Sequence, residues 1–320
     1  AAVAAGLVPV ALGTDTGGSV RVPAALCGVV GLKTTVGQVS RTGVHPLSWT
    51  LDSVGPIART VEDAALAYQE LQGADSRDDS TDRAAPRDVL AGLENGVRGL
   101  RLRFAETLFF HDLDPEVERA VRATGEVFRS LGADVAPMEV PEIAEAWTLP
   151  QRALLIASEG IAVNRELFDA HFDELDPVVA IRMAPGRELA AVDYLILLRS
   201  IVELRVRLLE RLRGVDALLV PTAMVPARPL QGLDTPSPAY FDYNLKLNRN
   251  AGLGNVLDLC GVSVPCGFTA EGLPIGLLVY AAPFREDLAL RIAHAYERAA
   301  AWPPRVPDLS WALAPILPTA

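Results

Sequence analysis

Cysteine, histidine and lysine are scarce in this sequence, and the shortage of the first two argues against disulfide and metal sites. The 320 residues include three cysteines and four histidines, and Lys33 and Lys246 are the two lysines. Three cysteines with no C-x-x-C pair predict neither a disulfide framework nor a zinc site, and they are typical of a reducing compartment. The histidines form no metal-spaced cluster. We therefore expect a cytoplasmic protein with no metal and no other cofactor.

Long apolar segments and basic surfaces are also missing. Half of the residues are hydrophobic, but no apolar run reaches the ~18–20 residues that span a bilayer. The apolar residues 1–12 are interrupted by Gly6 and Pro9 and have no basic flank, which excludes a signal peptide. A net charge of −11 argues against a surface for nucleic acid or anionic membranes. We expect no direct nucleic-acid or membrane partner.

Short apolar segments alternate with amphipathic helical patterns, which predicts an α/β fold of helices layered on a sheet. Thr60 is a typical N-cap before an acidic first turn, and Asp114-Pro115 is a second helix start. Strands are expected at residues 7–12, 100–105, 134–140 and 216–220 and within 261–279. Helices are expected at residues 60–71, 115–131, 192–213 and 285–301. We predict one domain, 1–320, with a possible helical subdomain at about 142–213.

The segment that indicates chemistry is a polar, glycine-rich loop at residues 13–19 (GTDTGGS). Gly17 and Gly18 allow backbone conformations in which successive amides converge on one point and bind an anion. Ser19 places a hydroxyl beside these donors, as acyl transfer requires. The loop lacks the P-loop, dinucleotide-binding and G-x-S-x-G patterns. From these residues alone, a tight turn with a surface serine remains the alternative.

A longer run that contains this loop, residues 13–33 (GTDTGGSVRVPAALCGVVGLK), closely resembles the signature of the amidase signature family. Further segments resemble the same family, and they lie at residues 37–43, 51–56, 59–65, 216–222, 261–267 and 272–277. One visible departure is Thr34-Thr35, where the family usually has Pro-Thr. The resemblance spans most of the chain and is strongest over its first 72 residues.

The resemblance implies a three-layer α/β/α fold with a mixed central sheet and a Ser–cis-Ser–Lys mechanism. In that mechanism Ser19 matches the nucleophile, and the backbone of Thr16, Gly17, Gly18 and Ser19 matches the oxyanion hole. Asp15 and Arg21 flank the loop with opposite charges. We hypothesise that these two residues pair and brace the loop.

The other two members of the implied triad have no matching position in the sequence. The cis-serine and the catalytic lysine of the family precede the segment with which this chain begins. Lys33 belongs to the Gly-Leu-Lys run of the family, so we do not assign it as the base. The first residue is Ala, not Met. We therefore expect a fragment that lacks the N-terminal part of the fold and is nearly inactive by itself, because a general base typically contributes about 10²- to 10⁴-fold.

Three functions remain open at this point. The first is an amidase that hydrolyses a small-molecule carboxamide through a Ser19 acyl-enzyme. The second is the A subunit of glutamyl-tRNA(Gln) amidotransferase, which uses the same chemistry on glutamine. The third is a non-catalytic fragment, because the catalytic lysine and cis-serine are missing. The charged helix face at residues 199–213 is expected to be solvated, with a homo-oligomer contact as the alternative.

Overall fold

The computed structural model describes residues 1–233, 235–300 and 306–310. Within these residues the strands are β1 (Val10–Asp15), β2 (Val30–Lys33), β3 (Ser53–Ala58), β4 (Arg101–Ala105), β5 (Asp134–Met138), β6 (Ala217–Pro221), β7 (Cys260–Phe268) and β8 (Pro274–Ala281). They form one sheet in the order β1-β3-β2-β7-β8-β6-β4-β5. β4 runs parallel to β5 and β6, and the other neighbours are antiparallel. The sheet is therefore mixed, as predicted.

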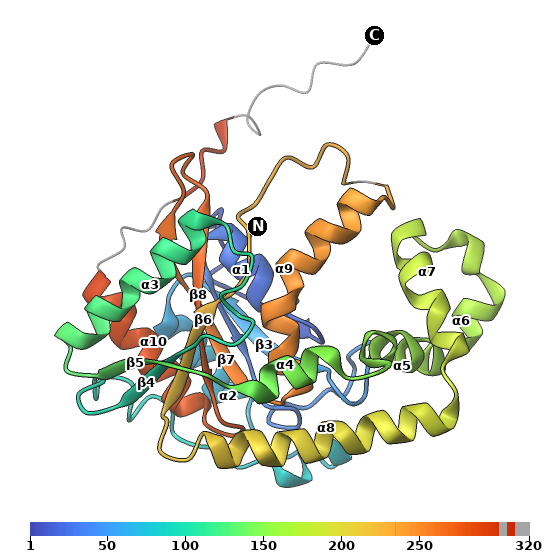
Figure 1. Cartoon of the computed structure of the whole chain (residues 1–320), viewed down its shortest axis with the longest axis horizontal. Helices are drawn as coiled ribbons and strands as arrows, with labels where there is room; N and C mark the ends of the chain where they lie inside the picture. The colour runs from blue at the N-terminus through green and yellow to red at the C-terminus, as the bar shows by residue number, and fades with distance from the viewer. Residues whose placement is uncertain (234, 301–305, 311–320) are drawn as a thin grey trace.

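Helices cover both faces of this sheet (Figure 1). On one face α2 (Val61–Leu71), α3 (Pro115–Ser130) and α10 (Glu286–Ala300) pack on the strands and α10 contacts both of the others. On the other face lies α1 (Arg21–Cys27), against which α9 (Pro238–Val256) packs. Thr60 and Asp114 cap α2 and α3 through their side chains, as their positions in the sequence indicated. The arrangement is the expected three-layer α/β/α fold.

Between β5 and β6 the chain is helical. The helices are α4 (Pro141–Thr148), α5 (Leu155–Val163), α6 (Arg165–Ala170), α7 (Pro177–Met183) and α8 (Ala191–Arg211). The long α8 returns to α4, where Arg211 and Arg207 pair with Glu142 and Glu145 at 2.5 Å. α5, α6 and α7 lie beyond the sheet, on the side of α9 (Figure 1), and share a small apolar cluster of their own. None of the described helices combines the length and the apolar character needed to cross a membrane.

β2, β3 and α1 lie in segments for which no strand or helix was predicted from the sequence. Two further differences concern β1 and α9. The first strand begins at Val10, after Pro9, and continues to Asp15, because residues 10–15 pair in register with β3. The predicted loop thus loses its first three residues to the sheet. The second difference is α9, which no apolar periodicity indicated. Ser237 caps it and Pro238 begins it, so its start had a signal in the sequence.

Close approach of α1 to the sheet depends on a missing side chain at Gly31 in β2. A Cβ atom there would lie 2.7 Å from the carbonyl oxygen of Val20 and 2.8 Å from Cβ of Ala24. β2 is hydrogen-bonded to β3 on one side and to β7 on the other, so the strand cannot yield without disturbing its neighbours. The close packing of α1 on the sheet therefore fixes the position of the loop between β1 and α1 relative to the sheet.

We expect Gly31→Ala to lower the free energy of unfolding by about 1–3 kcal/mol, because the added methyl group overpacks this contact. Urea unfolding measures the change. Gly92→Ala is the matched control, since its Cβ would meet only the Asn95 side chain at an ordinary 3.7 Å. Equal stability of the two variants would contradict the role given to Gly31.

Candidate active site

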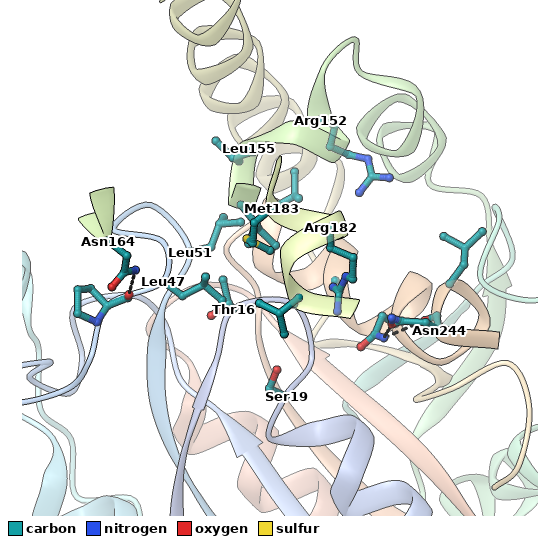
Figure 2. Close-up of a pocket in the computed structure, with 18 of the residues that line it drawn as sticks. Thr16, Ser19, Leu47, Leu51, Arg152, Leu155, Asn164, Arg182, Met183 and Asn244 are labelled. Atoms are coloured by element: carbon teal, nitrogen blue, oxygen red, sulfur yellow. Dashed lines mark hydrogen bonds between the residues drawn. The ribbon is translucent and has the colours of Figure 1, made fainter. Parts of the chain in front are cut away.

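The loop at residues 16–20 joins β1 to α1 and forms the floor of a cavity of about 690 Å³. Thr16, Gly17 and Ser19 line this cavity together with residues of α4 to α7 and α9. Ser19 is exposed, and Figure 2 shows its hydroxyl pointing from the loop into the space below Arg182. The predicted nucleophile therefore lies where a small molecule can reach it.

Asp15, at the end of β1, holds the backbone of this loop from below. One carboxylate oxygen accepts a hydrogen bond from the backbone amide of Gly18 at 2.8 Å, and the other accepts one from the amide of Val20 at 3.2 Å. Both oxygens also accept from Arg21, at 2.9 and 3.0 Å. Asp15 and Arg21 are fully buried. The structure thus brings Asp15 and Arg21 together in a bidentate ion pair.

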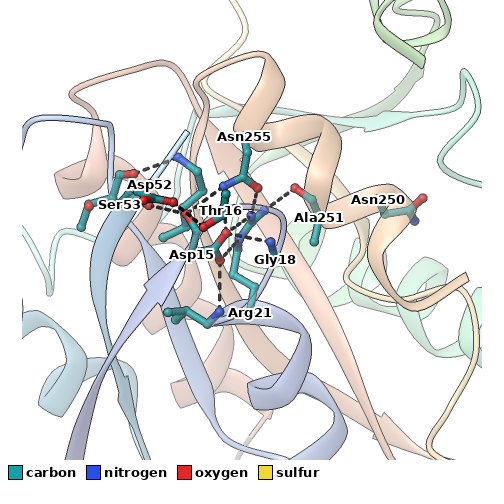
Figure 3. A network of polar contacts seen from close by, with 12 residues as sticks. Asp15, Thr16, Gly18, Arg21, Asp52, Ser53, Asn250, Ala251 and Asn255 are labelled. Carbon is teal, nitrogen blue, oxygen red and sulfur yellow. Dashed lines mark hydrogen bonds and ion pairs between the residues drawn. The ribbon is translucent and has the colours of Figure 1, made fainter. Parts of the chain in front are cut away.

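The remaining donors of Arg21 bind two other elements, β8 and α9 (Figure 3). Its guanidinium donates to the hydroxyl of Tyr280 at 2.6 Å, to the carbonyl oxygen of Ala251 at 2.9 Å and to Oδ1 of Asn255 at 2.6 Å. Asn255 in turn donates to Asp15 at 2.9 Å. The ion pair therefore connects β1 and α1 to β8 and α9.

Burial and charge act in opposite directions on this pair. Burial alone would raise the pKa of Asp15, but the neighbouring Arg21 guanidinium outweighs it and holds that pKa well below its usual range. Burial would likewise lower the pKa of Arg21, and the Asp15 carboxylate instead raises it. Both groups are therefore charged at neutral pH.

The backbone amides of the loop divide into two sets. Gly18 has φ +120°, and a Cβ atom there would lie 2.7 Å from Cβ of Ala251, so both its conformation and its packing require glycine. Its amide is already engaged by Asp15. In the described part of the chain, the amides of Thr16, Gly17 and Ser19 donate to no protein acceptor. Three of the four amides assigned to an oxyanion hole are therefore free to bind a ligand.

The Thr16 side chain connects the loop to one wall of the cavity. Its hydroxyl donates to Asp52 at 2.5 Å, and Asp52 also accepts the amides of Leu47 and Ser48 at 2.9 and 2.8 Å. Leu47 and Leu51 line the cavity. Asp52 was not assigned a role from the sequence, although it lies in one of the segments that resemble the family, residues 51–56.

No side chain among the described residues forms a hydrogen bond with the Ser19 hydroxyl. Lys33 is fully buried and does not line the cavity; burial lowers its pKa, and its Nζ donates to the carbonyl oxygen of Thr34 at 2.9 Å. Lys246 pairs with Asp242 at 2.8 Å. His45 lines the cavity but is not bonded to Ser19. The described residues therefore place the Ser19 hydroxyl beside free amide donors, with no general base hydrogen-bonded to it.

Comparisons with known proteins identify the relatives of this chain. A family model described as Amidase matches residues 1–290. The A subunit of the glutamyl-tRNA(Gln) amidotransferase of Roseiflexus sp. (strain RS-1) is 38% identical over 97% of this chain and 67% of its own length. An amidase of Pseudomonas putida is 38% identical over 97% of this chain and 66% of its own length. The solved structure of 6-aminohexanoate cyclic dimer hydrolase superposes with a TM-score of 0.86 at 27% identity, over 97% of this chain and 68% of that one. The chain thus spans about two thirds of the length of these relatives.

Asp15→Asn leaves the buried Arg21 guanidinium without its counter-charge, and we expect it to lower the free energy of unfolding by about 3–5 kcal/mol. The loss depends on pH, because the Asp15 pKa is lower in the folded chain than in the unfolded one. The ion pair contributes fully above the unfolded pKa of about 4 and less as the pH falls toward the folded pKa. Urea unfolding should therefore show the difference between the wild type and the variant shrinking below about pH 4.

The control for this measurement is Glu203→Gln, which removes the exposed ion pair with Arg199. We expect it to change the free energy of unfolding by less than about 1 kcal/mol. A loss for Asp15→Asn no larger than that of the control would show that the buried pair does not hold the loop.

Proposed function

Because the chain belongs to the amidase family, we propose that it hydrolyses a carboxamide C–N bond with Ser19 as the nucleophile. One observation supports this proposal above the others. The exposed Ser19 hydroxyl lies on the floor of the cavity beside the free amides of Thr16, Gly17 and Ser19. A nucleophile next to unpaired, fixed hydrogen-bond donors is the arrangement that acyl transfer requires.

In the proposed reaction, Oγ of Ser19 forms a bond to the amide carbonyl carbon, and the carbonyl oxygen becomes an oxyanion. The free amides of the loop donate to that oxygen. The C–N bond then breaks, the leaving nitrogen takes up a proton, and an ester on Ser19 remains. Water attacks the ester and releases the carboxylic acid with the free hydroxyl. Because Asp15 fixes the loop before substrate binds, these donors need little reorganisation during the reaction.

Removal of the Ser19 proton is the step that the described residues assist least. A general base in reach of the nucleophile typically contributes about 10²- to 10⁴-fold to the rate, and no described side chain is hydrogen-bonded to this hydroxyl. We therefore expect slow turnover of plain amides by these residues alone and faster reaction with electrophiles that carry a good leaving group.

The likeness to the A subunits of amidotransferases favours a second candidate function. Such a protein would use the same acyl transfer to release ammonia for a companion protein. The two candidates differ in their dependence on partners: an amidase turns over free amides unaided, whereas an amidotransferase component needs its companions. A non-catalytic fragment is the remaining alternative, and it predicts no reaction at Ser19.

We expect a fluorophosphonate probe to modify Ser19, with Oγ bonding to phosphorus as fluoride leaves. Intact-mass analysis and peptide mapping should show one adduct, and Ser19→Ala should abolish it. Ser130→Ala, which changes an exposed serine on α3, is the control and should label normally. An adduct that persists in Ser19→Ala, or no adduct in the wild type, would refute the proposed nucleophile.

A further inference from the structure

The cavity is positively charged in a strongly acidic chain. Its charged lining side chains are the guanidinium groups of Arg152, Arg182 and Arg249. No Asp or Glu among the described residues lines it, although the chain has 40 acidic residues and a net charge of −11. A cavity of this kind attracts anions and disfavours cationic ligands.

Arg152 lies against an aromatic ring and has no acidic partner. Its guanidinium stacks over the indole of Trp147 at 4.3 Å, and its Nε donates to the Trp147 carbonyl oxygen at 3.1 Å. Burial lowers the pKa of Arg152, and no nearby acid offsets this. The stacking holds the planar group in one orientation while its terminal nitrogens have no acceptor among the described residues. Such an arginine is well placed to bind a carboxylate.

Arg182, on α7, also lacks a hydrogen-bond or ion-pair partner in the described part of the chain. Figure 2 shows the Arg182 guanidinium pointing from α7 toward the side of the cavity where Ser19 lies. Arg249 is different, because it donates to the carbonyl oxygens of Leu108 and His111 at 2.8 Å. Arg249 therefore adds positive charge, whereas Arg152 and Arg182 have donors to offer.

The cavity wall near these arginines is apolar. Its side chains include Leu47, Leu51, Leu155, Ile156 and Met183. Apolar walls with a few polar anchors are typical of sites for small molecules, and the volume of about 690 Å³ lies within their usual range of roughly 300–1,000 Å³. A matching ligand has an apolar body and one anionic end.

We propose that the cavity selects an amide that bears a carboxylate, which Arg152 and Arg182 bind while the apolar body packs against the aliphatic wall. This substrate class rests on the proposed function, since the amide end is assigned to Ser19. The arginines are then specificity-determining residues that contact the substrate at the end remote from the reacting bond.

Calorimetry on the 320-residue chain tests this proposal with three probes. They are 4-(carbamoylmethyl)benzoate, its neutral analogue 2-(4-methylphenyl)acetamide, and the analogue in which a phosphonate replaces the carboxylate. We expect the carboxylate to bind at least about tenfold more tightly than the neutral analogue, because hydrogen bonds between charged groups are stronger than those between neutral groups. Equal or undetectable binding of these two probes would overturn the proposal. Tighter binding of the phosphonate would overturn the assignment to carboxylates.

Variants then assign the preference to residues. Arg182→Gln, at an exposed position, should reduce the carboxylate preference without affecting folding, and Arg152→Gln should reduce it as well. Arg152→Lys keeps the charge but loses the planar group stacked on Trp147, so it should restore only part of the preference. Arg199→Gln, on the outer side of α8, is the control and should keep the full preference. An unchanged preference in Arg152→Gln and Arg182→Gln together would contradict the proposal.

The test of the carboxylate subsite and the test of the proposed hydrolase can fail independently of each other. A Ser19 adduct with no preference for the carboxylate would overturn the anion subsite alone. A clear preference for the carboxylate without any Ser19 adduct would overturn the hydrolase assignment and leave the subsite in place.

Discussion

The buried ion pair between Asp15 and Arg21 is the interaction on which the rest of the site depends. Neither charge could be buried alone, because removing an ion from water costs several kcal/mol that only a partner and further hydrogen bonds offset. Here every donor and acceptor of the pair is used, through the amides of Gly18 and Val20, the carbonyl oxygen of Ala251 and the side chains of Tyr280 and Asn255. These partners belong to separate elements of the fold. The sheet, α1 and α9 can therefore close around the pair in only one arrangement.

That arrangement fixes the loop at residues 16–20, which carries the free backbone amides. Asp15 accepts a hydrogen bond from the Gly18 amide, and the positive φ of Gly18 turns the chain so that the neighbouring amides of Gly17 and Ser19 are left without protein acceptors. Donors that are held in place by the folded core retain their orientation when a ligand arrives. The same carboxylate that stabilises the fold thus determines which backbone groups remain available for chemistry.

The parts of this site that are close together in the chain could be predicted from the sequence. Asp15, Ser19 and Arg21 lie within seven consecutive residues, so the charges that flank the loop and the hydroxyl beside the glycines could be recognised together. The layered α/β fold followed from strong local patterns such as the Thr60 cap. Contacts between distant segments had no such signal. Nothing in the sequence placed Arg152 near Ser19, and α9 lacked the apolar periodicity that would have indicated a helix.

The floor and the roof of the cavity are stabilised in different ways, and this has a functional consequence. The floor is part of the main core, where the ion pair links strands and helices that cannot move independently. The roof belongs to α5, α6 and α7, which share a small separate cluster of Ala157, Phe168 and Met183. Among the described residues, no hydrogen bond joins Asp15 or Arg21 to α5, α6 or α7, so substitutions in the roof can change its side chains without removing a partner of the ion pair. A fold organised in this way can keep the geometry of the floor constant while Arg182 and the aliphatic side chains of the roof vary, so that the roof can change which ligand the cavity accepts.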